Sequence, residues 1–143
     1  MTRAELVQFL RRYKLAVQAS VAPGGPPQAA VVGFAVSDAC EIVFDTVATT
    51  RKYRNLGTDP RIALVIGWDN EITAQLEGVV DFPTGDELAR VREVYFAAYP
   101  DGRDRLAWEG ITHARVRPTW VRTTDFTTDP PLIVEMTGDD LAR

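Results

Sequence analysis

The sequence predicts a mainly β fold with a few α-helices, in which about six antiparallel strands close into a small barrel. Short apolar segments recur along the chain and are separated by clusters of Pro, Gly, Asp and Asn. Most of these separators are only as long as a hairpin turn, which favours antiparallel neighbours. Because the segments are almost uniformly apolar, closure of the sheet is favoured, since it removes exposed edges.

A helix and three strands are expected before residue 47. Thr2 and Glu5 have the spacing of a capping box, and apolar residues recur at helical intervals from Leu6 to Tyr13. The turn sequences PGGPP and SDA then separate three strands, over residues 15–22, 28–36 and 40–46. Since these strands are close in sequence, we expect them to form an antiparallel meander.

A short helix is expected over RKYRNL, with Thr49 or Thr50 as its N-cap and Gly57 at its end. Two more apolar segments follow as strands, over residues 61–68 and 72–82. The second of them alternates between two faces, which is typical of a strand with one buried side.

The last part of the chain is expected to hold one helix and one long strand. Thr84 and Glu87 have the spacing of a second capping box, which would begin an amphipathic helix. The strand spans residues 111–126 and is interrupted at Pro118, which indicates an edge, a bulge or a bend. The tail, residues 127–143, has no pattern that assigns it to an element.

Length and charge limit the function. The chain has 143 residues, the size of one domain. Its 16 basic and 20 acidic side chains give a net charge of −4, which argues against general nucleic-acid binding. The first residues lack the continuous apolar core of a signal peptide, and no segment approaches a membrane span. We therefore expect a cytoplasmic protein without nucleic-acid or membrane partners.

Cys40 and His113 are the one cysteine and the one histidine, so no Cys/His metal cluster can be built and no metal site is expected. Cys40 shares a strand face with Ile42 and Phe44, which indicates a buried apolar residue, although counting alone leaves a Cys–His nucleophilic pair open. His113 stands at the start of a segment in which apolar and polar residues alternate. It is either a satisfied strand residue, which we favour, or a donor in a pocket.

A cluster of cations stands out in this acidic chain, within the stretch FDTVATTRKYRNL. Arg51 and Lys52 would lie at the N-terminus of the short helix, where free N–H groups and the helix dipole attract anions. The hydroxyls of Thr49 and Thr50 add donors, and together these groups suit a dianionic phosphate. A solvated basic turn would explain the same residues, so the spacing leaves both interpretations open.

The stretch VFDTVATTRKYRNLGTDPRIALVIGW resembles the flavin-binding split-barrel family related to pyridoxamine 5′-phosphate oxidase. ITAQLEGVVDF and HARVRPTWVR are similar to later strands of that family, so the resemblance covers about residues 3–126 and leaves the tail 127–143 outside. It implies that residues 1–143 form a single six-stranded antiparallel split β-barrel that binds FMN. It also implies a homodimer with two cofactor sites between the subunits.

The resemblance further implies which residues meet the cofactor. Arg51 and Lys52 would hold the FMN phosphate, assisted by Thr50 and its neighbour Thr49. The remaining contacts would lie along the ring or the ribityl chain, and they are Asp45, Thr46, the main chain of Val31 and Val32, Thr73 and Gln75.

Departures from the oxidase pattern argue against oxidation of pyridoxine phosphate. Ala30 and Ala35 align with an arginine and a lysine of the oxidase. The tail also has no histidine to match the Arg-x-His segment with which the oxidase grips the phosphate of its substrate.

We therefore expect an FMN-dependent oxidoreductase that transfers hydride between the flavin and an unidentified small substrate. No catalytic acid or base can be named from the sequence. Two alternatives stay open. One is a deazaflavin-dependent reductase of the same fold, and the other is a non-catalytic flavin- or heme-binding protein, for which His113 would be the one histidine ligand.

Overall fold

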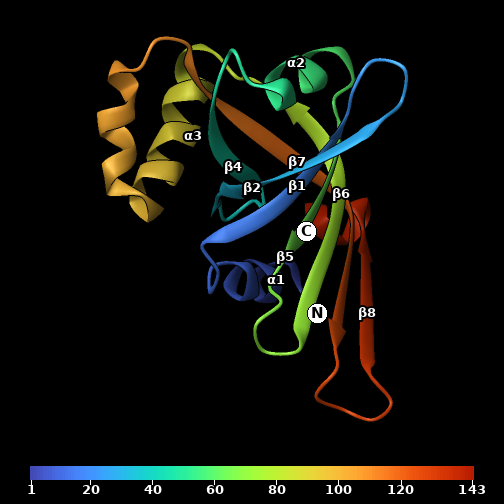
Figure 1. Ribbon diagram of the computed structural model, residues 1–143. Helices are drawn as coiled ribbons and strands as arrows, with labels where there is room; N and C mark the ends of the chain where they lie inside the picture. Colours follow the sequence, from blue (N-terminus) through green and yellow to red (C-terminus); the bar gives the residue numbers. More distant parts are fainter.

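The structure is a computed structural model that describes residues 1–143 (Figure 1). In chain order its elements are α1 (Arg3–Leu10), β1 (Leu15–Val21), β2 (Pro27–Gly33), β3 (Ala35–Val36), β4 (Ile42–Val47), α2 (Arg51–Thr58), β5 (Arg61–Ile66), β6 (Ile72–Asp81), α3 (Gly85–Ala98), the 3-10 helix η1 (Pro100–Ala107), β7 (Ile111–Asp125), β8 (Leu132–Thr137) and α4 (Gly138–Ala142). None of the helices combines the length and the apolar character that crossing a membrane requires.

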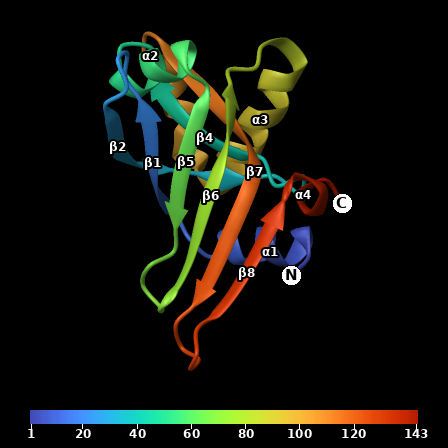
Figure 2. The same cartoon turned by 90° about the vertical axis from the view of Figure 1, so that its right-hand side faces the viewer.

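The strands form one antiparallel sheet in the order β2-β1-β5-β6-β7-β4-β3, and β8 pairs with β7. The long strand β7 organises this sheet. It pairs with β4 over residues 111–116, with β6 over residues 115–125 and with β8 over residues 120–125. The sheet curls into a half-barrel with α2 at one end and α1 towards the other (Figures 1 and 2). This architecture confirms the predicted fold class, mainly β with an antiparallel split barrel.

The sheet has eight strands instead of the six expected, for two local reasons. The tail supplies β8 and α4, which no pattern in the sequence had indicated. The expected second strand is split in two: β2 ends at Gly33 on β1, and the chain restarts as β3, which pairs with β4. At Gly33 a Cβ atom would lie 2.9 Å from the Tyr99 hydroxyl oxygen, so a larger residue would require the Tyr99 ring to move.

The interior of the curled sheet is the main apolar core. Phe44, Leu64, Leu76 and Val116 are among the fully buried side chains of the sheet, and α1 covers its lower end. Cys40 is 1% exposed and packs in this core, which confirms its prediction as a buried apolar residue. Burial raises the pKa of its thiol to about 11, so at neutral pH it stays protonated and is a poor nucleophile.

A second, smaller core lies between the outer face of β4 and the helix α3. Val43 faces this cluster from the sheet, and Val91, Tyr95 and Phe96 face it from α3. Strand β4 is therefore covered on both of its faces, and adjacent residues along it point into different environments.

The two predicted capping boxes have different outcomes. Thr2 and Glu5 form the expected reciprocal pair at the start of α1. Thr84 is the N-cap residue of α3 but makes no side-chain capping bond, so the second box was wrong. The carboxylate of Glu87 instead accepts hydrogen bonds from Arg90 and Arg115. These bonds are charge-assisted, so they are stronger than the bond to a backbone N–H that the capping box would have provided.

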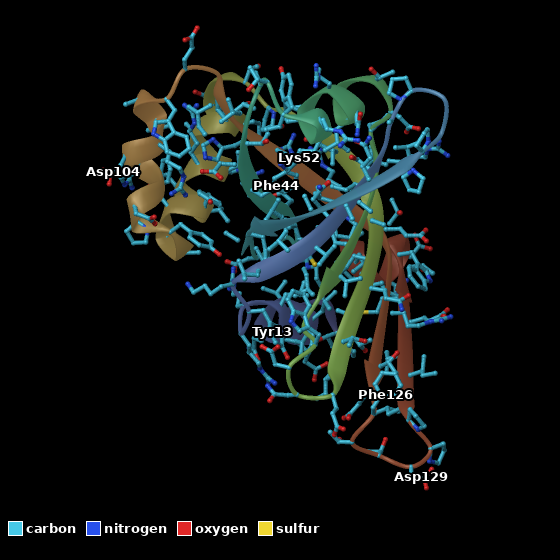
Figure 3. All side chains as sticks on the ribbon, viewed as in Figure 1. Tyr13, Phe44, Lys52, Asp104, Phe126 and Asp129 are labelled. Atoms are coloured by element: carbon cyan, nitrogen blue, oxygen red, sulfur yellow. The ribbon has the colours of Figure 1, made fainter.

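The expected interruption at Pro118 is confirmed as a shift in register between β6 and β7. Glu77 lies opposite Trp120 and Gly78 lies opposite Pro118, so Thr119 is the extra residue of a β-bulge. Figure 3 places Phe126 and Asp129 at the tip of the β7–β8 hairpin beyond this bulge, far from Lys52 on α2.

Candidate functional site

The N-terminus of α2 is the centre of the candidate site. Thr50 is its N-cap residue, and the Thr50 hydroxyl accepts a hydrogen bond from the Tyr53 N–H at 3.3 Å. The Thr46 hydroxyl, at the end of β4, lies 2.9 Å from the Thr50 hydroxyl. The sequence left the cap open between Thr49 and Thr50, and the structure selects Thr50.

Two backbone donors remain free at this helix end. The N–H groups of Arg51 and Lys52 have no hydrogen-bond acceptor, as expected for the first turn of a helix. They point out of the positive end of the helix dipole, where an anion is stabilised.

The cations of this turn are also unpaired. Arg51, Lys52 and Arg54 form neither a salt bridge nor a side-chain hydrogen bond, and Arg51 and Arg54 are exposed. Half of the basic side chains, in contrast, are held by carboxylates: Arg11, Arg61, Arg90, Arg103, Arg105, Arg115, Arg117 and Arg122. In a chain with a net charge of −4, three unpaired cations within four residues form a local surface suited to an anion.

Helix α2 is fastened to the sheet on two sides. The rings of Tyr53 and Phe82 lie 4.9 Å apart, which joins the helix to the end of β6. On the other side, the buried Asn55 donates hydrogen bonds to Ser20 and Gln28. Sequence reasoning missed Asn55, and the one available signal was a polar residue placed beside Leu56 on the buried side of a short helix.

Asp45 lies apart from this site. Its carboxylate accepts a hydrogen bond from Arg105 Nε at 2.6 Å, and Arg105 also donates to the Tyr95 hydroxyl at 3.0 Å. Because neighbouring residues of a strand face opposite sides, Asp45 points towards α3 and η1, and Thr46 points towards the N-cap of α2. The structure therefore brings Thr46, Thr50, Arg51 and Lys52 together and holds Asp45 elsewhere.

Three of the expected ring contacts, Val31, Thr73 and Gln75, lie on the outer face of the sheet. Val31 is 60% exposed on the edge strand β2, and Val32 is buried on the inner face. Gln75 is exposed on β6 and shares the outer face with Thr73. Strands β1 and β5 separate β2 from β6, so Val31 and Gln75 lie roughly 14 Å apart at the usual strand spacing. One chain alone does not join these residues into a single pocket.

His113 lies beneath α3, in the second core. It is 0% exposed, and Tyr95 and Phe96 pack edge-on against its ring. Its Nδ1 accepts a hydrogen bond from Arg92 Nε at 3.3 Å, and its buried Nε2 has no partner. Burial, with the charge of Arg92, lowers its pKa to about 4. His113 is thus a neutral core residue, only half satisfied, and it has no access to a ligand at the surface.

No group of three or more His, Cys, Asp or Glu side chains in the structure is arranged to hold a metal ion. The donor set at α2 consists of cations, backbone N–H groups and hydroxyls. Such donors suit an anionic group, in particular a phosphate.

Comparison with known proteins agrees with this fold. The model of the pyridoxamine 5′-phosphate oxidase family matches residues 2–125. A pyridoxine/pyridoxamine 5′-phosphate oxidase from Bordetella avium is 35% identical over 91 residues, which are 63% of this chain and 41% of that enzyme. The match therefore spans less than half of the curated relative.

Two solved structures share the fold. The structure of a heme binding protein from Mycobacterium smegmatis has a TM-score of 0.84 and 22% identity, and covers 99% of this chain and 60% of that one. A pyridoxamine 5′-phosphate oxidase-related, FMN binding protein from Nostoc punctiforme has a TM-score of 0.73 and 13% identity, with 99% and 90% covered. At these identities the likeness is one of fold.

Proposed function

The chain belongs to the pyridoxamine 5′-phosphate oxidase family, and from this premise we propose that it is an FMN-dependent oxidoreductase acting on a small substrate other than pyridoxine phosphate. The observation that carries the proposal is the unpaired cationic N-terminus of α2. Family members include proteins named for FMN binding, and the donors at α2 fit the phosphate of that cofactor.

The FMN phosphate would be held by Arg51 and Lys52, through their side chains and their free N–H groups. The hydroxyls of Thr50 and Thr46 would lie beside the phosphate. Thr49 would add a contact from the loop that joins β4 to α2. This arrangement needs no movement of a salt bridge, because these cations have no carboxylate to release.

The ring would lie between two copies of the chain. The outer face of the sheet exposes apolar side chains that a monomer rarely presents together: Leu15 is 48% exposed, Val31 60%, Val65 38% and Val79 46%. We propose that this face forms a homodimer. Since Thr73 and Gln75 lie on it, far from α2 of their own chain, they would serve the site of the other subunit, next to the main chain of Val31 and Val32.

When bound, FMN would supply the hydride-transfer chemistry. The residues of the chain would bind and orient the cofactor, and the apolar face of the sheet would exclude water from it. A reaction of this class needs no protein nucleophile, which is consistent with the buried, protonated Cys40 and the buried His113.

Two alternatives fit less well. A heme held by histidine would require His113, which is fully buried under α3. A deazaflavin with a long anionic tail would favour an extended basic groove, and the unpaired cations of α2 form one compact turn.

The proposal is tested by adding FMN to the purified protein and then adding NADPH or NADH without oxygen. We expect a protein-bound flavin spectrum that bleaches on reduction. A bound flavin that no nicotinamide reduces would indicate a flavin-binding protein without this activity, and no uptake of FMN would overturn the proposal.

A further inference from the structure

Asn55 is the polar side chain that joins α2 to the sheet. It is 4% exposed, and its Nδ2 donates to Ser20 Oγ at 3.2 Å and to Gln28 Oε1 at 2.9 Å. Ser20 and Gln28 lie directly opposite each other on β1 and β2. Both protons of one amide are therefore used to hold the helix against two adjacent strands.

Helix α2 depends on such contacts for its direction. It has eight residues, and isolated helices of fewer than about 12 residues are marginal in water. Its buried side chains are Asn55 and Leu56. The apolar packing of Leu56 has little directional preference, whereas the two hydrogen bonds of Asn55 constrain both distance and angle.

The same amide connects the two ends of the proposed cofactor site. Asn55 lies one helical turn after Arg51, whose cation would meet the phosphate. Gln28 lies on β2, three residues before Val31, where the ring would lie. The bond between Asn55 and Gln28 therefore sets the spacing between the phosphate end and the ring end of the site.

We infer that Asn55 is a positioning residue: through Ser20 and Gln28 it aims the α2 cations at the phosphate of a flavin mononucleotide. This inference rests on the proposed function. It concerns the selectivity of the site for a flavin that carries one phosphate, and it assigns Asn55 no contact with the cofactor.

The test compares FMN with riboflavin, which has the same ring and no phosphate, in titrations of the full-length protein. Asn55→Leu keeps the number and the branching of the side-chain heavy atoms and removes both hydrogen bonds. We expect it to weaken FMN binding by about tenfold or more, and riboflavin binding by less than about twofold, because only the phosphate contacts lose their alignment.

The matched control is Thr58→Ala. This exposed hydroxyl donates to the Arg54 carbonyl at 3.3 Å at the far end of α2 and makes no hydrogen bond to β1 or β2. We expect it to leave the ratio of the two affinities unchanged. Gln28→Met removes one of the two acceptors at a half-buried position, and it replaces Asn55→Leu if that variant does not fold. It is expected to change the ratio in the same direction.

If Asn55 had a purely structural role, its replacement would weaken the binding of FMN and of riboflavin equally. An unchanged ratio of the two affinities in a folded variant therefore overturns the inference. The double variant R51A/K52A separates this failure from failure of the proposed function. If R51A/K52A abolishes the preference for FMN and Asn55→Leu does not, only the role of Asn55 is wrong. If R51A/K52A leaves the preference unchanged, the phosphate site itself is wrong, and the inference fails with it.

Discussion

The hydroxyls of Thr46 and Thr50 lie 2.9 Å apart, which links the last buried position of β4 to the N-cap of α2. This contact fixes where the chain leaves the sheet and enters the helix. It also places the unpaired cations of the first helical turn at one end of the curled sheet (Figure 1). The proposed function depends on this junction.

Replacing Arg51 tests the junction as a phosphate site. We expect Arg51→Ala to weaken FMN binding by about 10- to 100-fold, because a charge-assisted hydrogen bond contributes about 1.5–3 kcal/mol. Arg12→Ala is the control, since Arg12 is also an exposed cation without a salt bridge but lies just after α1, away from α2. Fluorescence quenching of FMN measures both variants. Equal losses would mean that net charge, and no specific contact, attracts the cofactor.

Replacing Asp45 tests the separation of the two faces of β4. The Asp45 and Arg105 side chains are 18% and 21% exposed. Asp45→Ala would therefore leave the largely buried guanidinium of Arg105 without the carboxylate that accepts its Nε hydrogen bond. We expect a loss of about 1–3 kcal/mol in the free energy of unfolding, with FMN affinity changed by less than about twofold.

Asp38→Ala is the matched control for that experiment. Asp38 pairs with Arg11, but its side chain is 94% exposed, and such surface pairs contribute less than about 1 kcal/mol. Urea denaturation measures both variants. A large loss of FMN affinity in Asp45→Ala would show that Asp45 contacts the cofactor after all.

His113 is expected to make stability depend on pH. Its pKa is about 4 in the folded protein, against 6.5 for an exposed histidine, so between these values the unfolded chain binds a proton that the native chain does not. The free energy of unfolding therefore falls as the pH falls from about 6.5 to about 4. Each pKa unit corresponds to about 1.4 kcal/mol, so the full loss is about 3 kcal/mol.

His113→Asn isolates this contribution. Asparagine keeps an acceptor for Arg92 and does not titrate, so the variant should be less stable at neutral pH but should lose less stability on acidification. Carboxylates that titrate in the same range are common to both proteins and cancel in the difference. Parallel pH profiles for the two proteins would contradict the assignment of a buried, neutral His113.

Gly78 is expected to tolerate no side chain. A Cβ atom there would lie 2.6 Å from the Arg117 carbonyl oxygen, at the bulge between β6 and β7. Because the clash is with backbone, Gly78→Ala should reduce the free energy of unfolding by about 1–3 kcal/mol or more. In Gly57→Ala nothing lies within 4 Å of the new atom, so we expect a small gain from helix propensity. Thermal unfolding compares the two variants, and similar melting temperatures would contradict this account.

Much of the fold was accessible from the sequence because its signals are local. The capping box of Thr2 and Glu5, the helical spacing of α3 and the break at Pro118 each depend on residues within one turn or bulge. Strand β8 was not accessible, because its short apolar patch follows two prolines and becomes a strand only by pairing with the second half of β7.

The site was only partly accessible for a similar reason. The cations and the cap of α2 are consecutive in sequence, so their chemistry could be inferred directly. The partner of Asp45 is Arg105, 60 residues further along the chain, and the acceptors of Asn55 are 27 and 35 residues before it. Neither pairing follows from a local pattern, and only the assembled sheet and helices reveal them.

The most direct test of the central claim is to measure the dissociation constants of FMN and riboflavin for the unmodified protein under identical conditions. If the N-terminus of α2 binds the cofactor phosphate, FMN should bind at least about tenfold more tightly, and added inorganic phosphate should compete with FMN but not with riboflavin. Equal affinities, or binding of neither flavin, would contradict the account.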